Sequence, residues 1–221
     1  MRPTIMKIST EAVAANARLF RSLIPGCVKM MCVVKADAYG HDAALTAKKL
    51  LRAGADAFAV AIVEEAEALR GAGIDAPVLI LGGACEESLR QAVRARASQA
   101  VYLPEMLDVM QDEAVRTGMR ARAHLKLDTG MSRIGVRDEA ALAALLEHWK
   151  RCPDVEMEGA FTHFCVADSD PEFTSLQNRR FAGMLAQVRA AGFAPVAHAA
   201  ATSAMLNPAL QYDMVRPGIG L

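Results

Sequence analysis

One lysine stands at the end of an unbroken apolar run, in the segment MMCVVKADAYGHD (residues 30–42). Lys35 has two interpretations: an amine nucleophile that forms a Schiff base, or a lysine whose ammonium reaches solvent from a strand end. Tyr39 follows in the turn and is either a hydrogen-bond donor to a phosphate or a tyrosine packed on the rim of the fold. Position alone leaves the interpretation of Lys35 open, and for Tyr39 it favours packing on the rim.

A second group of ionisable residues lies in the segment HLKLDTGMSRIG (residues 124–135). His124, Lys126 and Asp128 alternate along the chain, so they share one face of a strand. Arg133 follows in the glycine-containing loop. His163 ends a further apolar segment, where a lone histidine is more often structural than catalytic. Its company with Lys35 is what favours a functional site.

The last part of the chain supplies groups suited to an anion. Ser203 can begin a short helix whose free N–H groups bind an anion, and Gly218 and Gly220 let backbone approach a ligand closely. Arg216 either faces the same site or pairs with a carboxylate for structure. An amine, a phosphate cradle and an arginine together favour pyridoxal 5′-phosphate as the cofactor. The histidines lack partners at metal-ligand spacing, and no dinucleotide or P-loop motif is present, so neither type of site is predicted.

These residues fall at the ends of short β-rich segments that alternate with helical segments, which predicts parallel strands joined by helical crossovers. The predicted strands are residues 28–35, 57–61, 78–81, 100–103, 122–127, 158–163, 196–199 and 214–216. The predicted helices are residues 10–23, capped by Ser9 or Thr10, and residues 42–53, 63–72, 86–95, 106–117, 138–151 and 176–191. Eight units predict an α/β fold, a TIM-like (β/α)8 barrel, whose working groups lie after the C-terminal ends of the strands.

The chain is short for such a barrel. The fold typically needs about 250 residues, whereas this chain has 221. No linker or break in composition divides it, so we expect one domain over residues 1–221. We also expect no helix after the eighth strand, and a longer protein of which this domain is the N-terminal part.

Composition excludes several classes of function. The charges balance, with 25 Lys and Arg against 25 Asp and Glu, and 53% of the residues are apolar. Balanced charge argues against a nucleic-acid or anionic-membrane surface, and no apolar run has the length of a membrane span. Residues 1–10 lack a leader-peptide pattern, and the five cysteines include no C-x-x-C pair. We therefore expect a cytoplasmic protein with reduced thiols.

Four ordered motifs resemble the alanine racemase family, in its N-terminal barrel domain, a fold-type III pyridoxal phosphate enzyme. VVKADAYGH resembles the cofactor-lysine motif, with Asp37 where the family usually has Asn. HLKLDTGMSRIG resembles the central motif, with Ser132 where the family usually has Gly, and THF and VRPGI also match. The resemblance covers effectively the whole chain. It implies a homodimeric enzyme that interconverts L-alanine and D-alanine for peptidoglycan precursors.

The resemblance also implies a role for each matching residue. Lys35 is similar to the lysine that binds the cofactor covalently and then acts as a base. Lys126 is similar to a lysine often carbamylated by CO2, which holds the counterpart of Arg133 near the cofactor's phenolic oxygen. His163 is similar to the partner of Arg216, the arginine that faces the pyridine ring. The remaining implied cofactor contacts are Tyr39, Ser203, Gly218 and Ile219 at the phosphate, with Thr202 in place of the usual Asn, and Leu81 on the ring.

An arginine beside the pyridine nitrogen favours racemisation, because a group with a pKa above about 12 keeps its proton and leaves the ring a weaker electron sink. The family's second base is a tyrosine from the C-terminal β domain of the partner subunit. The tyrosines of this chain do not match it, so we expect that domain to follow Leu221. Two alternatives stay open: a racemase for serine or another amino acid, and a non-catalytic pyridoxal-phosphate-binding barrel for cofactor homeostasis.

Overall fold

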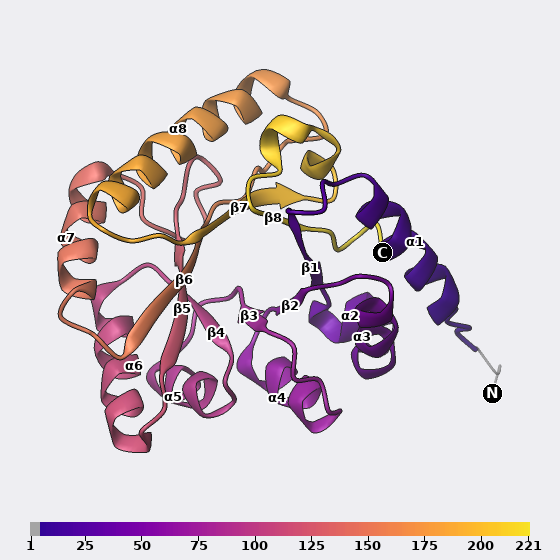
Figure 1. The fold of residues 1–221 in the computed structure, drawn as a ribbon, viewed down its shortest axis with the longest axis horizontal. Coiled ribbons are helices and arrows are strands. Elements are labelled where there is room, and N and C mark those ends of the chain that lie inside the picture. The colour runs from indigo at the N-terminus through magenta and orange to yellow at the C-terminus, as the bar shows by residue number, and fades with distance from the viewer. Residues whose placement is uncertain (1–4) are drawn as a thin grey trace.

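The computed structural model describes residues 5–221, and within them eight parallel strands close into a barrel. Each strand pairs with the next one in the sequence, and the first pairs with the last (Figure 1). The strands are β1 (Lys29–Val33), β2 (Ala57–Val60), β3 (Val78–Ile80), β4 (Ser98–Val101), β5 (Ala121–Lys126), β6 (Val155–Phe161), β7 (Val196–Ala201) and β8 (Met214–Arg216). The closed ring confirms the predicted barrel.

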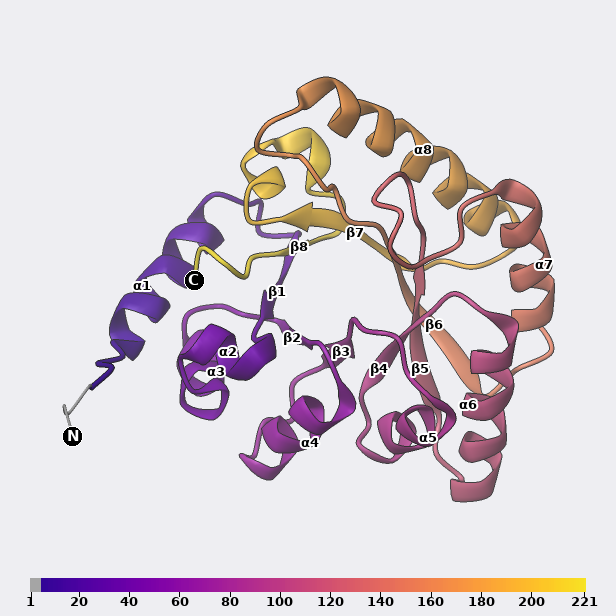
Figure 2. The same cartoon turned by 180° about the vertical axis from the view of Figure 1, so that it is seen from behind.

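Helices surround the strands and cover the outer face of the barrel (Figures 1 and 2). They are α1 (Thr10–Ser22), α2 (Lys35–Gly40), α3 (Ala43–Arg52), α4 (Val63–Gly71), α5 (Glu86–Arg94), α6 (Pro104–Thr117), α7 (Glu139–Trp149) and α8 (Pro171–Ala190). Two short 3₁₀ helices, η1 (Ala204–Leu206) and η2 (Pro208–Leu210), connect β7 to β8. Residues 217–221, the last that the structure describes, form no helix.

The residues of β1 show how the sequence builds two separate cores. Successive side chains of a strand point to opposite faces. Met30 and Cys32 belong to the core between the strands and the helices, whereas Met31 and Val33 belong to the core inside the barrel. The inner core is small: among the described residues it has eight buried residues, of which three are alanines. Four buried polar side chains share this interior and surround the ring of Phe161: His124, Lys126, His198 and Arg216.

Side-chain caps fix where several helices begin. Ser9 caps α1, because its hydroxyl accepts a hydrogen bond from the N–H of Ala12 at 3.2 Å. Asp170 caps α8 in the same way, accepting from the N–H of Phe173 at 2.9 Å. The predicted start of α8 at residue 176 was wrong. The Asp-Pro pair forms the cap and the first turn, so the helix begins at Pro171.

Two predicted strands are displaced along the sequence. β4 covers Ser98–Val101 and not residues 100–103, and β6 covers Val155–Phe161 and not residues 158–163. Both predictions followed apolar residues, but the part of each strand that they missed includes polar ones, among them Gln99 of β4 and Glu156 of β6. These polar residues pair in the sheet as regularly as apolar ones, so an apolar run marks only part of each strand.

The strand pairing is irregular in two of the ladders that the structure describes. Glu158 is an extra residue of β6, because its neighbours Met157 and Gly159 pair with consecutive residues of β5. β7 has an extra residue between His198 and Ala201 relative to the facing span of β8. Such bulges redirect side chains, and both of these lie beside the buried polar groups inside the barrel.

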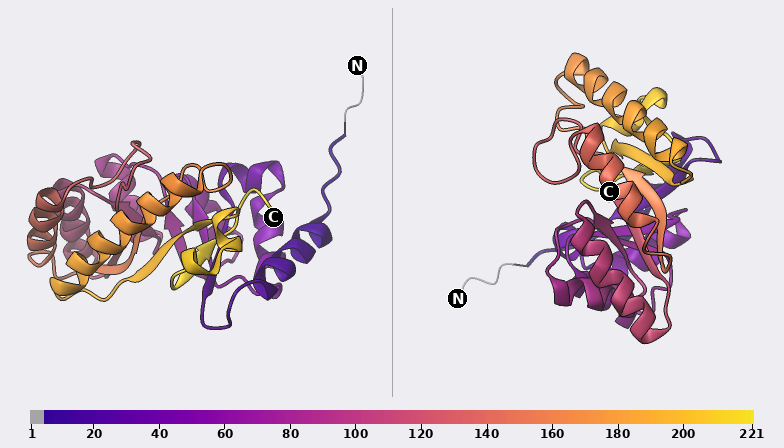
Figure 3. Two further views of the ribbon diagram at one scale, coloured as in Figure 1. Left: turned by 90° about the horizontal axis from the view of Figure 1, so that it is seen from above. Right: turned by 90° about the vertical axis from the view of Figure 1, so that its left-hand side faces the viewer.

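The last described residues of the chain lie against the first helix (Figure 1). The C-terminal segment ends beside α1, where a Cβ on Gly220 would lie 2.7 Å from the ring of Phe20 (Figures 1 and 3). The structure does not describe residues 1–4. The expectation that residues 1–10 form no leader peptide therefore lies partly outside the described residues. Across residues 5–221, no helix combines the length and the apolarity needed to cross a membrane.

Candidate functional site

Lys35 lies at the mouth of the barrel, just after the C-terminal end of β1. It is half-buried at the start of α2, and a cavity of about 370 Å³ opens beside it. The predicted site residues that line this cavity are Lys35, Tyr39, His163, Ser203, Arg216, Gly218 and Ile219. They follow or end β1, β6, β7 and β8, so closure of the barrel is what brings them together.

The backbone of α2 is left-handed. Residues 36–39 have φ between 51° and 56° and ψ between 34° and 50°. This conformation costs an L-residue roughly 1–2 kcal/mol relative to the right-handed helix. Neighbouring groups hold the turn: the N–H of Ala36 donates to the carboxylate of Glu65 at 2.6 Å, and the carboxylate of Asp37 accepts from the N–H of Ala43 at 2.7 Å. Backbone strain that the surroundings enforce is typical of functional sites.

Tyr39 and Gly218 lie in contact at the edge of the cavity. A Cβ on Gly218 would lie 2.8 Å from the hydroxyl oxygen of Tyr39 and 3.1 Å from Cβ of Val33, so a side chain there would displace one of them. The N–H of Gly218 donates to the hydroxyl of Thr202 at 3.1 Å. Burial raises the pKa of Tyr39, which keeps its hydroxyl protonated as a donor. With Ser203, the residue that precedes η1, these groups offer donors to an anion.

Arg216 is a buried cation held by neutral acceptors. Its guanidinium donates to Nδ1 of His198 at 2.8 Å and to the carbonyl oxygens of Thr162 and Ala199 at 2.8 and 3.0 Å. Within the described part of the chain, no carboxylate oxygen lies within 4.0 Å of its nitrogens. Burial lowers the pKa of Arg216 to about 9, so it is still charged at neutral pH. A fixed cation without a contacting anion is suited to face a ligand.

The imidazole that hydrogen-bonds Arg216 belongs to His198 and not to His163, which corrects the pairing implied by the resemblance. His198 lies on β7 and pairs with Met214 of the neighbouring β8, which brings its ring within reach of Arg216. His163 follows the end of β6 and lines the cavity instead, where its carbonyl accepts from the side chain of Gln177 at 3.2 Å. Burial, followed by the charge of Arg216, lowers the pKa of His163 to about 3, so its ring is neutral.

Three predicted site residues do not line the cavity: Leu81, Lys126 and Arg133. Leu81 packs against the inner core, and Arg133 is exposed in the loop after β5. Lys126 is buried inside the barrel, where its amine donates to a backbone carbonyl at 2.8 Å and lies 5.2 Å from the ring centre of Phe161. Burial, followed by the charge of Arg216, lowers the pKa of Lys126 to about 7. A large fraction of this amine is therefore uncharged at neutral pH.

Sequence reasoning missed His198 and Phe161. The ring of Phe161 stacks on the imidazole of His198, with ring centres 4.9 Å apart and planes within 3° of each other. It thereby fixes the ring that accepts from Arg216. The available signal was a histidine in the middle of the small-residue strand VAHAAA, since a polar residue inside a barrel needs a partner there.

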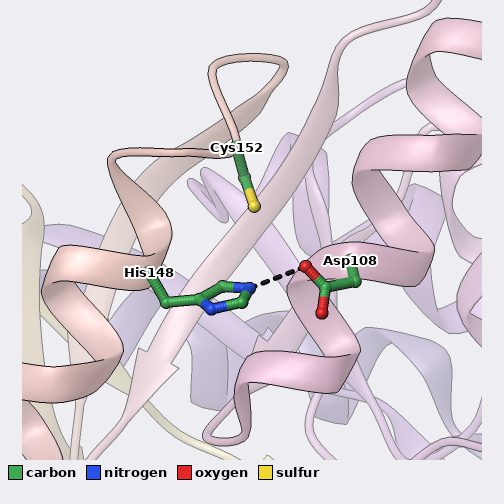
Figure 4. Close-up of side chains that lie close together, drawn as sticks. All are labelled: Asp108, His148 and Cys152. Carbon is green, nitrogen blue, oxygen red and sulfur yellow. Dashed lines mark hydrogen bonds and ion pairs between the residues drawn. The ribbon is translucent and has the colours of Figure 1, made fainter.

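A second cluster of ionisable side chains lies outside the barrel, between α6 and the end of α7 (Figure 4). Ligand-type atoms of Asp108, His148 and Cys152 lie within 4.8 Å of one another. Both ring nitrogens of His148 are engaged, one with Asp108 at 2.6 Å and the other with Arg151 at 2.7 Å. Burial raises the pKa of Cys152, which stays a thiol. Contacts between two helices account for this cluster.

Sequence comparison links the chain to one family. The family model described as "Alanine racemase, N-terminal domain" matches residues 8–221. The chain is similar to alanine racemase 2 of Oceanobacillus iheyensis, at 40% identity over 100% of this chain and 56% of that protein. It is also similar to the alanine racemase of Symbiobacterium thermophilum, at 42% identity over 100% of this chain and 59% of that protein.

Structural comparison agrees with the sequences. The alanine racemase from Bacillus anthracis with bound L-Ala-P matches with a TM-score of 0.91 and 31% identity, over 98% of this chain and 58% of that one. The alanine racemase from Streptomyces coelicolor matches with a TM-score of 0.92 and 34% identity, over 96% of this chain and 58% of that one. The chain thus spans between 56% and 59% of the length of these relatives.

Proposed function

The chain belongs to the family of alanine racemase N-terminal domains, and we propose that it is the pyridoxal-phosphate-binding barrel of an enzyme that interconverts L-alanine and D-alanine. The cavity at the barrel mouth is the observation that carries the proposal. It joins the amine of Lys35, the hydroxyls of Tyr39 and Ser203 and the cation of Arg216. An aldehyde that bears a phosphate and a pyridine ring is complementary to this set of groups.

We propose residues of this chain as partners for each part of the coenzyme. Lys35 would hold it covalently, and Arg216 would face its ring nitrogen. Its phosphate would bind at Tyr39, Ser203, Gly218 and Ile219. When bound, pyridoxal phosphate supplies an electron-withdrawing ring that acidifies the α-carbon proton of an amino acid. Arg216 retains its own proton, so the ring nitrogen gains none from it, and simple removal and return of the α-proton is favoured over transamination.

Lys35 serves one face of the substrate, because a single amine moves a proton at only one side of the α-carbon. The other tyrosines of the described chain are occupied elsewhere: Tyr102 lies against Gly83, and Tyr212 donates to Asn178 at 2.5 Å. We propose that the second proton-transfer group comes from outside these 221 residues, from the partner subunit of a homodimer.

Lys126 is proposed as a site of carbamylation. A buried amine with a pKa of about 7 is about half uncharged at neutral pH, and the uncharged form adds to CO2 to give a carbamate and one proton. The product is an anion that can pair with Arg133, whose charge acts on Lys126. Carbon-13 NMR in labelled bicarbonate should show a carbamate resonance that Lys126→Met abolishes. Its absence would contradict the assignment.

We further propose that the product D-alanine feeds peptidoglycan precursors and that the enzyme works in the cytoplasm. The five cysteines support the second statement, because all of them are free thiols in the structure. A reducing compartment keeps thiols in this state.

Deuterium exchange separates proton abstraction from complete racemisation. With pyridoxal phosphate, this chain should exchange the α-proton of one alanine enantiomer with solvent. It should racemise at least about a hundredfold more slowly than the longer enzyme, because a positioned acid or base contributes about 10²–10⁴-fold. Lys35→Met should abolish the exchange. Racemisation as fast as that of the longer enzyme would place the second base within these residues, and no exchange with either enantiomer would contradict the role of Lys35.

A further inference from the structure

A connected series of side chains crosses the barrel from its mouth to its opposite end. Arg216 donates to Nδ1 of His198 at 2.8 Å, and Nε2 of His198 lies 2.8 Å from Nδ1 of His124. Nε2 of His124 lies 3.8 Å from a carboxylate oxygen of Glu158, which also accepts from the hydroxyl of Ser98 at 2.5 Å. We call Arg216, His198, His124 and Glu158 the barrel relay.

The arginine determines where every proton of the barrel relay lies. A guanidinium has only donors, so Nδ1 of His198 is an acceptor and its proton is on Nε2. That proton is donated to Nδ1 of His124, which puts the proton of His124 on Nε2, toward Glu158. Burial lowers the pKa of both histidines, so both rings are neutral. Every N–H of the series therefore points from Arg216 toward Glu158.

The barrel departs from regular geometry where it accommodates this series. Glu158 is the extra residue of the β6 bulge, and β7 has its extra residue just after His198. Gly159 is required for a different reason, because a Cβ there would collide with Nδ1 of His124. A regular barrel would need neither the two bulges nor this glycine. The strands themselves are therefore irregular where they accommodate the polar side chains.

The far end of the barrel relay is an anion. Glu158 lines a hollow of about 440 Å³ at the N-terminal ends of the strands, and its second oxygen lies 3.5 Å from Arg122. Burial raises the pKa of Glu158, but the interactions with His124 and with the Ser98 hydroxyl outweigh this and hold the pKa below its usual range. The barrel relay thus joins a cation at the mouth to a carboxylate at the opposite end.

We propose that Glu158 is a positioning residue for Arg216, acting across the barrel through His124 and His198. Hydrogen bonds in series polarise one another, so the carboxylate makes Nδ1 of His198 a stronger acceptor and fixes the guanidinium at the cavity. The 3.8 Å contact is longer than a hydrogen bond, and the carboxylate acts there through its charge on the N–H of His124. The consequence for a coenzyme rests on the proposed function, whereas the positioning of Arg216 does not.

Nitrogen-15 NMR of the histidines and arginines tests this without any coenzyme. Glu158→Leu removes the acceptor, and Glu158→Gln removes only its charge. Glu156→Leu is the matched control, because Glu156 lies on the same strand at the same hollow and pairs with Arg120 at 3.3 Å. We expect Glu158→Leu to shift the ring nitrogens of His124 and His198 and to raise the N–H exchange rate of the Arg216 guanidinium about tenfold. Glu158→Gln should give a smaller change of the same sign, and Glu156→Leu should give none.

Unchanged His198 resonances and unchanged Arg216 exchange in Glu158→Leu would overturn the proposal. An equal effect of Glu156→Leu would overturn it too, because it would reveal a general loosening of β6. If Glu158→Leu does not fold, Glu158→Gln decides: a shifted His198 nitrogen supports the proposal and an unshifted one refutes it. Since no coenzyme is present, failure here leaves the proposed function standing, and failure to bind pyridoxal phosphate leaves this result standing.

Discussion

Two buried charges of this molecule have opposite surroundings. Glu113 on α6, outside the barrel, accepts from Arg94 at 2.6 Å and from two nitrogens of Arg116 at 2.6 and 2.8 Å, with Arg90 at 3.5 Å. Hydrogen bonds from Arg116 and then Arg94 lower the pKa of Glu113 to about 2. Arg216 is buried inside the barrel, but its hydrogen bonds go to an imidazole and two carbonyls.

The difference separates a structural charge from a charge that is available to a ligand. A buried ion is costly unless it is paired and hydrogen-bonded. Around Glu113 that cost is offset by the contacting arginines. Both of its oxygens already accept hydrogen bonds, so the carboxylate is not available to a ligand. Arg216 has its hydrogen bonds but no contacting anion, so its field acts on whatever enters the cavity. We therefore expect changes at Glu113 to affect stability and changes at Arg216 to affect binding.

The largest expected effects come from removing each charge in turn. Arg216→Gln should weaken the binding of pyridoxal phosphate about tenfold or more, because a hydrogen bond to a charged group contributes about 1.5–3 kcal/mol. Glu113→Gln should lower the free energy of unfolding by about 2 kcal/mol, since its arginines lose the negative charge and one of the two oxygens that accept their hydrogen bonds. Absorbance titration with the coenzyme and urea unfolding measure the two effects.

Each variant is the control for the other. Glu113→Gln should bind the coenzyme as the wild type does, and Arg216→Gln should change the unfolding free energy less than Glu113→Gln, because it removes a cation that had no contacting anion. The comparison breaks down if Arg216→Gln is the more destabilising variant and binds the coenzyme normally.

The free energy of unfolding should depend on pH through His163 in one pH range and through Glu113 in another. His163 titrates at about 3 in the folded chain and near its ordinary 6.5 when unfolded, so the unfolded state binds the extra proton. Stability should fall as pH falls from 6.5 toward 3, by at most about 1.4 kcal/mol per pH unit for one group. Glu113 has a folded pKa of about 2 against 4.5, so its contribution is present above 4.5 and lost as pH falls toward 2.

Two variants test which residue is responsible for each pH range. His163→Gln should flatten the stability curve between pH 6.5 and 4.5, where the buried His124 and His198 account for the remaining slope. Glu113→Gln should flatten it only below pH 4.5. Urea unfolding at a series of pH values measures both curves. A change in the slope of the stability curve above pH 5 in Glu113→Gln would contradict the separation, because a lower stability that does not vary with pH is expected there.

A smaller effect is expected from backbone conformation, which differs between the turn at the barrel mouth and a helix on the outside of the barrel. Ala36 of α2 and Ala68 of α4 are both exposed, but Ala36 has a φ of 51° and Ala68 lies in a right-handed helix. Ala68→Gly should destabilise by about 1 kcal/mol. Ala36→Gly should be neutral or stabilising by up to about 1 kcal/mol, because glycine relieves the left-handed strain. Thermal unfolding measures both, and equal destabilisation would contradict an enforced left-handed turn.

The sequence predicts the barrel well, because apolar strands and helices alternate through most of the chain. It misplaces β4 and β6 for a reason tied to the site. Ser98 and Glu158 are strand residues that point to one another, and they belong to a polar series that no apolar pattern reveals. Local rules thus fail where buried polar groups replace core residues.

The candidate site was predictable where it follows strand ends and unpredictable where it depends on register. Lys35, Tyr39 and Arg216 lie in segments whose place at the mouth follows from the barrel alone. His198 becomes the partner of Arg216 through the pairing of β7 with β8, a ladder whose register shifts between His198 and Ala201. The left-handed turn is also absent from the sequence pattern, because Ala36 is a residue that favours right-handed helices, and the contact with Glu65 that holds it is formed by the tertiary structure.

The central claim is that Lys35 is the amine that binds the coenzyme, and borohydride reduction followed by peptide mapping tests it most directly. The chain offers a rival inside the same barrel, since Lys126 is a buried amine with a pKa of about 7. We predict that pyridoxal phosphate, fixed by reduction, labels the peptide that contains Lys35, and that Lys35→Met removes the label while Lys126→Met keeps it. A label on Lys126 or on another lysine, or no label at all, would contradict the account.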